Sequence, residues 1–300
     1  MSVMRDNINL GPRNLREQMR KGFVASAGVF NGISAIIAQR SGFRSTYLSG
    51  SGVAGAMGFP DLSVTTLTEV ADEAARITAV TEVPLIVDVD TGFGEAINVT
   101  RTIREMERAG VSAVHMEDQV LPKKCGQLNG KRIVGTDEMI SKIRAAVDAR
   151  KNPDFVIIAR TDARSVNGLD DAIDRANAYF EAGSDVVFTE ALETREEFRT
   201  FARRAKGPLM ANMTEFGKSP LLSVDELKEA GYRMVIFPLT AFRAFLKTAA
   251  ETYADLFRNG TQRDFMDRIM TREDFYSIIG YDNYEREDRE LAGRTRKSQR

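Results

Sequence analysis

The chain has little of three residue types that often carry chemistry or cross-links. It holds one cysteine, Cys125, one histidine, His115, and no tryptophan. A single cysteine excludes an intrachain disulfide, and a single histidine excludes a metal site built from several histidines of one chain. Catalysis would therefore rest on carboxylates, Lys, Arg, hydroxyls, the one thiol or a cofactor.

Net charge is also nearly absent, because 42 Lys and Arg stand against 43 Asp and Glu in 300 residues. That balance argues against a nucleic-acid groove and against a polybasic membrane surface. No stretch approaches the ~20 apolar residues of a membrane span. Residues 1–20 contain six charged side chains and no apolar stretch typical of a signal peptide. We therefore expect a cytoplasmic protein.

The sequence does contain a repeated unit, in which a polar amphipathic stretch ends at a glycine and a short apolar run follows. A glycine just beyond a helix is the usual left-handed cap, so each one predicts a helix end and a strand start. These glycines are Gly42, Gly110, Gly183 and Gly231. Eight apolar runs predict eight strands: 23–29, 46–49, 84–89, 113–117, 155–159, 186–190, 208–211 and 234–237.

Apolar runs that alternate with helical stretches are typical of parallel strands buried on both faces. Eight β/α units in about 250 residues indicate an α/β fold, a (β/α)8 barrel of the TIM type, with an open doubly wound sheet as the alternative. After residue 239 the pattern becomes helical, with helices expected over 241–258 and 265–292. We predict a catalytic barrel over residues 1–245 and a C-terminal helical extension over 246–300 that belongs to the same domain.

Polar residues close several of the predicted strands and tend to stand two positions apart. Residues i and i+2 of a strand share a face, and barrel active sites form where the strands end. The pairs are Ser49/Ser51, Asp88/Asp90, His115/Glu117, Arg160/Asp162 and Asn212/Thr214. Five strand ends would thus point paired polar groups to one place, and Glu190 adds a further carboxylate.

Asp88 and Asp90 close a buried strand, where two like charges raise one pKa or bind a cation. Either residue alone is better explained as an acceptor for loop N–H groups. Together with Glu117 and Glu190, the pair favours a hard divalent cation, since Mg²⁺ prefers one or two carboxylates plus water and substrate oxygens. The lack of His and Cys ligands disfavours Zn²⁺.

Cys125 lies in a loop of sequence Lys123-Lys124-Cys125-Gly126. Neighbouring lysines favour the thiolate and predict a lowered thiol pKa, and the alternative is an inert buried cysteine. His115 faces the barrel interior by strand alternation. A hydrogen-bonded core histidine and a direct catalytic role are both open for it.

Segment 50–55 (GSGVAG) matches the pattern G-x-G-x-x-G of dinucleotide-binding proteins. That interpretation needs a helix to start there and an acidic residue about 20 positions on, at the end of the next strand. Gly58 and Pro60 are expected to interrupt such a helix, and Asp72 and Glu73 fall inside the helix that follows. We predict no NAD site; the glycines instead let backbone N–H groups approach a carboxylate or phosphate.

Five segments resemble the isocitrate lyase/phosphoenolpyruvate mutase superfamily, and the resemblance extends over about residues 20–292. They are 47–52 (YLSGSG), 85–94 (LIVDVDTGFG), 115–119 (HMEDQ), 123–126 (KKCG) and 159–163 (ARTDA). The KKCG loop is similar to the carbon–carbon lyases and differs from the phosphonate mutases, which lack the cysteine. Segments 212–217 (NMTEFG) and 271–273 (TRE) resemble the 2-methylisocitrate lyases, which yield pyruvate and succinate in the methylcitrate cycle of propionate breakdown.

The resemblance implies Mg²⁺ or Mn²⁺ as cofactor, a 2-hydroxy di- or tricarboxylate substrate, and a homotetramer of dimers that swap C-terminal helices. It implies metal ligation by Asp88 and Asp90, with Glu117 bound through water. It implies catalytic roles for Cys125, Tyr47, Arg160 and Glu117. It implies substrate contacts by Ser49, Gly50, Ser51, Asp61, Lys123, Gly126, Gln127, Arg160, Glu190, Asn212, Thr214, Arg243 and Arg272.

Gln127 departs from the superfamily, whose lyase loop usually has a histidine at this position. Glutamine forms hydrogen bonds but does not titrate near neutral pH. The substrate is therefore open between 2-methylisocitrate and a related acid such as 2,3-dimethylmalate or isocitrate. Hydrolysis or decarboxylation of oxaloacetate or phosphonopyruvate, and a catalytically silent binding protein, are the remaining alternatives.

Overall fold

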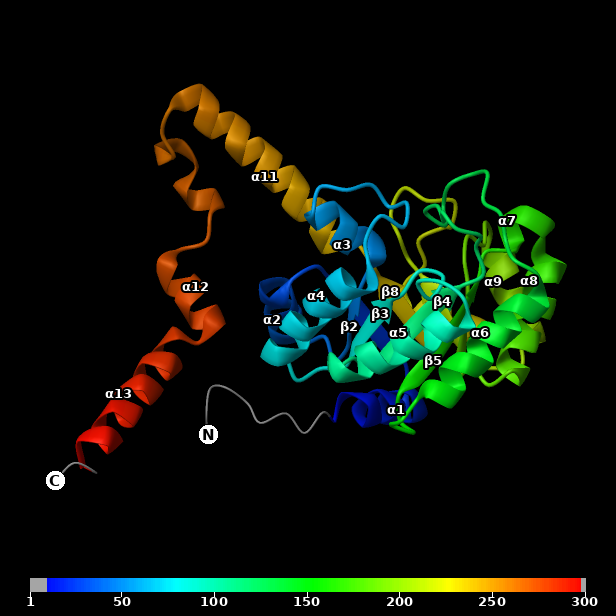
Figure 1. Cartoon of the computed structure of the whole chain (residues 1–300). Helices are drawn as coiled ribbons and strands as arrows, with labels where there is room; N and C mark the ends of the chain where they lie inside the picture. The colour runs from blue at the N-terminus through cyan, green and yellow to red at the C-terminus, as the bar shows by residue number, and fades with distance from the viewer. Residues whose placement is uncertain (1–9, 298–300) are drawn as a thin grey trace. The chain divides into compact units, whose positions relative to one another are not determined.

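The computed structural model describes residues 10–297, with side chains described through residue 293 (Figure 1). Residues 10–242 form one compact unit and residues 243–297 form another. The first and last residues of the two predicted domains, 1–9 and 298–300, lie outside the described residues.

The larger unit is a closed barrel of eight parallel strands in sequential order, with β1 paired to both β2 and β8. The strands are β1 (Val24–Val29), β2 (Thr46–Leu48), β3 (Leu85–Asp88), β4 (Ala113–Glu117), β5 (Val156–Thr161), β6 (Val186–Thr189), β7 (Leu209–Asn212) and β8 (Met234–Phe237). Each predicted strand is confirmed to within two residues at either end. Closure rules out the open doubly wound sheet.

Helices surround the strands (Figure 1). They are α1 (Gly11–Lys21), α2 (Gly32–Arg40), α3 (Gly50–Ala56), α4 (Leu67–Val80), α5 (Ala96–Arg108), α6 (Thr136–Ala149), α7 (Arg164–Asn167), α8 (Leu169–Glu181), α9 (Arg195–Arg204), α10 (Val224–Ala230) and the start of α11 (Thr240–Asn259). The four glycines predicted as caps have φ between 78° and 110°, the left-handed region that favours glycine. Thr66 with Glu69, and Ser223 with Glu226, form reciprocal capping boxes at the starts of α4 and α10.

Apolar side chains fill the inside of the barrel, so that the interior is a packed core and not a channel. Ile86, Ile158, Phe188 and Met234 belong to this buried cluster, and Leu15 of α1 packs against it. A larger apolar cluster lies between strands β1 to β5 and the helices outside them. Chemistry is therefore confined to the ends of the barrel.

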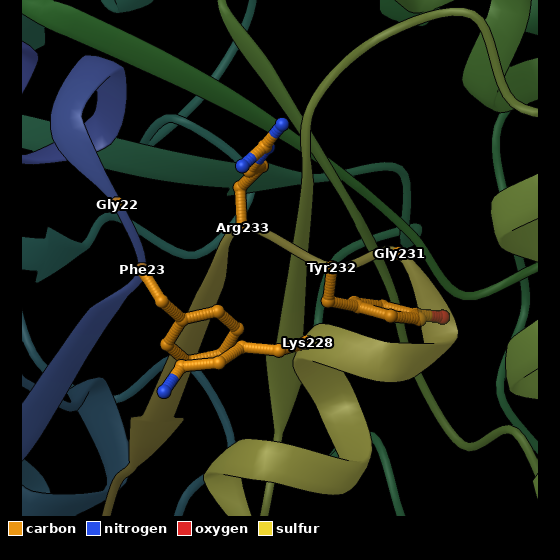
Figure 2. Close-up of a pocket in the computed structure, with 6 residues that line it drawn as sticks. All are labelled: Gly22, Phe23, Lys228, Gly231, Tyr232 and Arg233. Carbon is orange, nitrogen blue, oxygen red and sulfur yellow. The ribbon is translucent and has the colours of Figure 1, made fainter.

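The end at which the strands begin carries a pocket of about 360 Å³ (Figure 2), lined by Gly22, Phe23, Lys228, Gly231, Tyr232 and Arg233. Phe23 directly precedes β1, and Arg233 directly precedes β8. The Lys228 ammonium lies 5.7 Å from the centre of the Phe23 ring. The Tyr232 hydroxyl points away from Lys228 and Arg233 in Figure 2, and its ring packs against Phe198. This pocket is at the opposite end from the polar strand ends.

The C-terminal unit contains the rest of α11, a 3-10 helix η1 (Arg263–Arg268), α12 (Arg272–Ile279) and α13 (Tyr281–Lys297). The segment predicted as helical over 265–292 is helical, but it is divided into three helices by breaks at residues 269–271 and at Gly280, which is left-handed. Arg268 forms an ion pair with Asp255 at 3.0 Å, which ties η1 to α11. None of the helices between residues 10 and 297 combines the length and the apolar character that a membrane span requires.

Candidate active site

The two aspartates predicted as metal ligands point at one small space. Asp88 ends β3, and its carboxylate accepts hydrogen bonds from Gly50 N at 3.1 Å and Asp90 N at 3.0 Å. A Cβ added at Gly50 would lie 3.1 Å from Asp90 Oδ1 and 3.2 Å from Asp88 Oδ2. Strand alternation is the wrong explanation for this convergence. Asp90 lies beyond β3 with a φ of 48°, so a turn brings the two carboxylates together.

The glycine-rich segment after β2 is helical, which corrects the sequence analysis. α3 starts at Gly50 and ends at Ala56, just before Gly58. Ser49 is its N-cap residue and Ser51 lies in its first turn, so these two serines do not share a strand face as predicted. A side chain at position 50 would crowd the two aspartate carboxylates, which would have to shift to admit it.

Burial and neighbouring charges shift the pKa values of the two aspartates in opposite directions. Burial raises the pKa of Asp90 to about 6, with Lys123 opposing the shift and Asp88 adding to it. Burial also disfavours the charge of Asp88, but His115, Lys123 and Arg160 together hold its pKa below the usual value. Asp88 is therefore the more acidic of the two carboxyl groups, and Asp90 is the one that takes up a proton more readily.

Lys123 is a buried cation that pairs with the carboxylates of Asp61 and Asp90. Its ammonium lies 2.9 Å from Asp90 Oδ1 and donates a short hydrogen bond to Asp61 Oδ1. The side chain is buried. Lys123 therefore joins the loop that carries Cys125 to both Asp61 and the aspartate pair.

His115 and Tyr47 lie inside the barrel below the aspartates. A hydrogen bond of 2.6 Å joins Tyr47 Oη to His115 Nε2, and Asp88 Oδ1 lies 3.6 Å from the same nitrogen. Burial lowers the pKa of His115 to about 4, so that the imidazole is neutral at pH 7. His115 is therefore a hydrogen-bonded interior histidine that also borders the aspartate pair.

Arg160 forms ion pairs with carboxylates at the ends of three neighbouring strands. Its guanidinium lies 3.0 Å from Glu117 Oε2, 2.9 Å from Asp162 Oδ2 and 3.7 Å from Glu190 Oε2. Burial disfavours the charge of Asp162, but Arg160 and Lys131 lower its pKa to about 2. Burial raises the pKa of Glu117 well above its usual value, against the opposing effect of Arg160. Within residues 10–297, neither carboxylate oxygen of Glu117 accepts a hydrogen bond.

The loop with Cys125 lies directly on this cluster. A Cβ added at Gly126 would lie 2.2 Å from Arg160 Nη2 and 2.5 Å from Glu190 Cγ. Gln127 donates a short hydrogen bond to Glu190 Oε1, and its own Oε1 accepts one from Lys218 N at 2.8 Å. The loop backbone thus covers the strand ends with no room for a side chain at position 126.

The predicted lowering of the Cys125 pKa is wrong, because burial raises it. The thiol is partly buried, and the ammonium of Lys123 is held by Asp61 and Asp90. Its positive charge is therefore largely balanced before it can stabilise a thiolate. At neutral pH the Cys125 sulfur keeps its proton.

The remaining predicted site residues lie at two places. Asn212 ends β7 and donates to Glu190 Oε2 at 3.2 Å, and the buried Thr214 follows it in the chain. Arg243 lies in α11 and Arg272 is the first residue of α12, both in the C-terminal unit. Their substrate contacts stay predictions.

Two residues that hold the site together were not predicted as site residues. Lys131 is buried and donates to Gly126 O and to Asp162 Oδ1, each at 2.5 Å. Gln119 pairs with the backbone of Lys124 through both its amide nitrogen and its oxygen. A lysine in a polar loop is usually exposed, so the sequence alone gives no reason to place Lys131 in the site. The reason is its contact with Asp162, which lies 31 residues away in the chain.

A second pocket, of about 390 Å³, opens beside the aspartate pair. It lies between the loop before α4 and the loop after β3, with Asp90, Thr91, Phe93 and Arg101 among its lining residues. Three lining residues, Ser63, Asp90 and Phe93, have positive φ values without being glycine. Such backbone conformations concentrate at functional sites.

Comparison with known proteins places the chain in a family. The family model described as phosphoenolpyruvate phosphomutase matches residues 15–257. The chain belongs to the phosphoenolpyruvate phosphomutase family. It is 52% identical over 279 residues to the 2-methylisocitrate lyase of Aeropyrum pernix, covering 93% of this chain and 90% of that one. The predicted superfamily is thereby confirmed.

Solved structures of this family share the fold. A 2,3-dimethylmalate lyase superposes with a TM-score of 0.88 at 36% identity, covering 94% of this chain and 95% of that one. A phosphonopyruvate hydrolase in complex with oxalate and Mg²⁺ superposes with a TM-score of 0.84 at 28% identity, covering 92% of this chain and 96% of that one. That neighbour holds Mg²⁺ together with a small dicarboxylate, oxalate.

Proposed function

We propose that this protein is a carbon–carbon lyase that cleaves 2-methylisocitrate to pyruvate and succinate, as a step of propionate breakdown in the cytoplasm. The observation that carries the proposal is the 52% identity to a 2-methylisocitrate lyase over nearly the whole chain. The site supports the same chemistry, because a cysteine loop lies over an arginine, several carboxylates and a convergent aspartate pair.

The residues of the site fit a magnesium ion. Among the described residues, no three His, Cys, Asp or Glu side chains gather as a complete ligand set. Asp88 and Asp90 nevertheless converge, and among the described residues the buried oxygens of Glu117 accept no hydrogen bond, although Oε2 forms an ion pair with Arg160. Mg²⁺ usually takes one or two carboxylates and completes its shell with water and substrate oxygens. We therefore assign Asp88 and Asp90 as direct ligands and Glu117 as a water-mediated one, with Mn²⁺ as the alternative metal.

A bound Mg²⁺ would lower the pKa of the substrate hydroxyl and orient the 2-hydroxy acid. Arg160 is buried and charged, and arginine suits bidentate contact with a carboxylate, so it can stabilise the negative charge that develops on the succinate half. Ser49, Gly50 and Ser51 would bind the carboxylate of the half that becomes pyruvate. The remaining predicted contacts would hold the other carboxylates.

The bond changes balance with one proton lost and one gained. The hydroxyl proton leaves, the carbonyl of pyruvate forms, and the carbon–carbon bond gives its electron pair to the succinate carbon. Cys125 then donates its thiol proton to that carbon. The raised pKa of Cys125 suits this role, because a general acid has to carry its proton at the working pH. The closed loop keeps water away from the carbanion.

The metal and the substrate can be tested in one experiment. We expect pyruvate release from 2-methylisocitrate to require Mg²⁺, to stop with EDTA and to return when Mg²⁺ is restored. Asp88→Ala should lose turnover and Mg²⁺ binding by calorimetry, while Asp225→Ala, at an exposed position on α10, should retain both. Faster pyruvate release from 2,3-dimethylmalate or isocitrate would replace the substrate assignment. Full activity of Asp88→Ala after chelation would refute the metal assignment.

We also propose that the C-terminal unit mediates assembly into a homotetramer. Large apolar side chains stand exposed on it, with Phe257 94% and Tyr253 72% accessible, and Phe245, Met266, Met270 and Leu291 also exposed. Exposed apolar surface of this extent marks a protein contact. Sedimentation equilibrium of the full chain should give a mass of four subunits, and Phe257→Glu should lower it. A monomeric wild type would contradict the proposal.

A further inference from the structure

Two buried side chains that are not among the proposed reacting groups form hydrogen bonds with the loop that carries Cys125. Gln119 donates from Nε2 to Lys124 O at 2.9 Å and accepts from Lys124 N at 3.0 Å, so it holds the start of the loop. Lys131 holds the middle of the loop, because its ammonium donates to Gly126 O at 2.5 Å. The same ammonium donates to Asp162 Oδ1. The backbone next to the thiol is thus tied to the end of β5.

Asp162 connects this tie to the substrate-binding arginine. Its Oδ2 accepts from Arg160 Nε at 2.9 Å, and its Oδ1 lies 3.2 Å from Arg160 Nη2. Its backbone N–H donates to Asp118 Oδ1 at 2.8 Å, and Asp118 in turn accepts from Thr161 and Tyr179. These hydrogen bonds hold Asp162 in place, so the Lys131 ammonium donates to a carboxylate whose position is fixed.

A buried ammonium is costly unless charged and polar partners surround it. The Lys131 side chain is buried. Its ammonium forms an ion pair with Asp162 and donates a hydrogen bond to the carbonyl oxygen of Gly126 in the loop. Lifting the loop would remove the Gly126 carbonyl from this ammonium. The bond to Gly126 therefore favours the closed loop even before a substrate binds.

We propose that Lys131 is a positioning residue that latches the carbonyl of Gly126 to Asp162 and thereby holds the Cys125 loop closed over Arg160. The catalytic consequence rests on the proposed function, in which Cys125 donates a proton. The latch itself is a property of the free protein and can be measured without any substrate.

The single cysteine of the chain provides the measurement. Every thiol reaction with iodoacetamide reports Cys125, so the alkylation rate reports the accessibility of this partly buried thiol, which should increase when the loop opens. We expect Lys131→Met to raise this rate about tenfold or more, the factor expected from loss of one hydrogen bond to a charged group. The matched control is Lys142→Met, since Lys142 is also buried but lies on α6 with its ammonium 3.9 Å from Glu138. The control should stay within about twofold of the wild type.

Turnover gives the second readout. Lys131→Met should lower kcat with little change in KM, and Lys131→Arg should recover part of kcat by restoring the charge. Lys131→Gln, which keeps a donor without the charge, serves if circular dichroism shows Lys131→Met to be unfolded. A folded Lys131→Met variant with the wild-type alkylation rate would contradict the proposed role of Lys131. Unfolding of both Lys131→Met and Lys131→Gln would also contradict it. If the wild type does not cleave 2-methylisocitrate, the proposed function fails while the alkylation result still decides the latch.

Discussion

Replacement of Cys125 by serine is expected to lower kcat by about 10²–10⁴, the usual contribution of a general acid. A serine hydroxyl is a much weaker acid than a thiol and cannot donate its proton to the succinate carbon at a comparable rate. Binding of pyruvate and succinate should change little, because the side chains keep nearly the same shape. Steady-state kinetics with 2-methylisocitrate and product inhibition by succinate would measure the two effects separately.

The pH dependence provides a control for this assignment. A general acid works while it is protonated, so activity should fall as the pH rises through the thiol pKa. Because burial raises the pKa of Cys125, that fall should lie above the usual pKa of a cysteine. Cys125→Ser should lack this alkaline fall in its residual activity. A serine variant with near wild-type kcat would show that another group donates the proton.

Replacement of Gly126 by alanine is expected to lower kcat/KM by about 10² or more, since misplacement of a catalytic group by about 1 Å can cost that much. The added methyl would lie 2.2 Å from Arg160 Nη2 and 2.7 Å from Glu190 Cδ, so the loop could not close. The φ of Gly126 is not in the left-handed region, so the effect is steric and the fold should persist. Kinetics and the alkylation rate of Cys125 would both report the open loop.

Gly135→Ala is the matched control for this substitution. Gly135 precedes α6 shortly after the same loop, and a Cβ added there would meet nothing within 4 Å. Its kinetics should stay close to those of the wild type. Wild-type kinetics in Gly126→Ala would mean that the loop closes in a different position from the one in this structure.

The barrel was predictable because its evidence is local in the sequence. Each strand is a short apolar run, and glycines such as Gly110 and Gly231 mark the helix ends with φ values that other residues rarely adopt. These features depend on neighbours a few positions away. The breaks at residues 269–271 and Gly280 were missed, since the aromatic and charged pattern there continues without interruption.

The site was only partly predictable, because its geometry depends on distant contacts. Asp88 and Asp90 were found from their spacing, although a turn brings them together. The pKa of Cys125 was predicted in the wrong direction, because the sequence shows the nearby Lys123 but not the burial of the thiol, nor Asp61, 62 residues from Lys123, which accepts a hydrogen bond from the Lys123 ammonium. Lys131 was missed for the same reason.

The Gln127 side chain forms hydrogen bonds on two sides. Its amide joins Glu190 to the backbone of Lys218, so it bridges the end of β6 and the loop between β7 and α10. A hydrogen bond from Gln127 to a substrate carboxylate stays a prediction, and it would use the amide hydrogen that Glu190 does not take.

The partial burial of the only cysteine, on the loop over the strand ends, also affects how the protein reacts with oxidants. The thiolate is the form that peroxide attacks, so a raised pKa slows the first step to sulfenic acid. No second cysteine exists in the chain to convert that sulfenic acid into an intrachain disulfide. Recovery therefore needs a thiol from outside, such as glutathione, and without it oxidation continues to the irreversible sulfinic acid. The enzyme is slow to oxidise but has no internal means of repair.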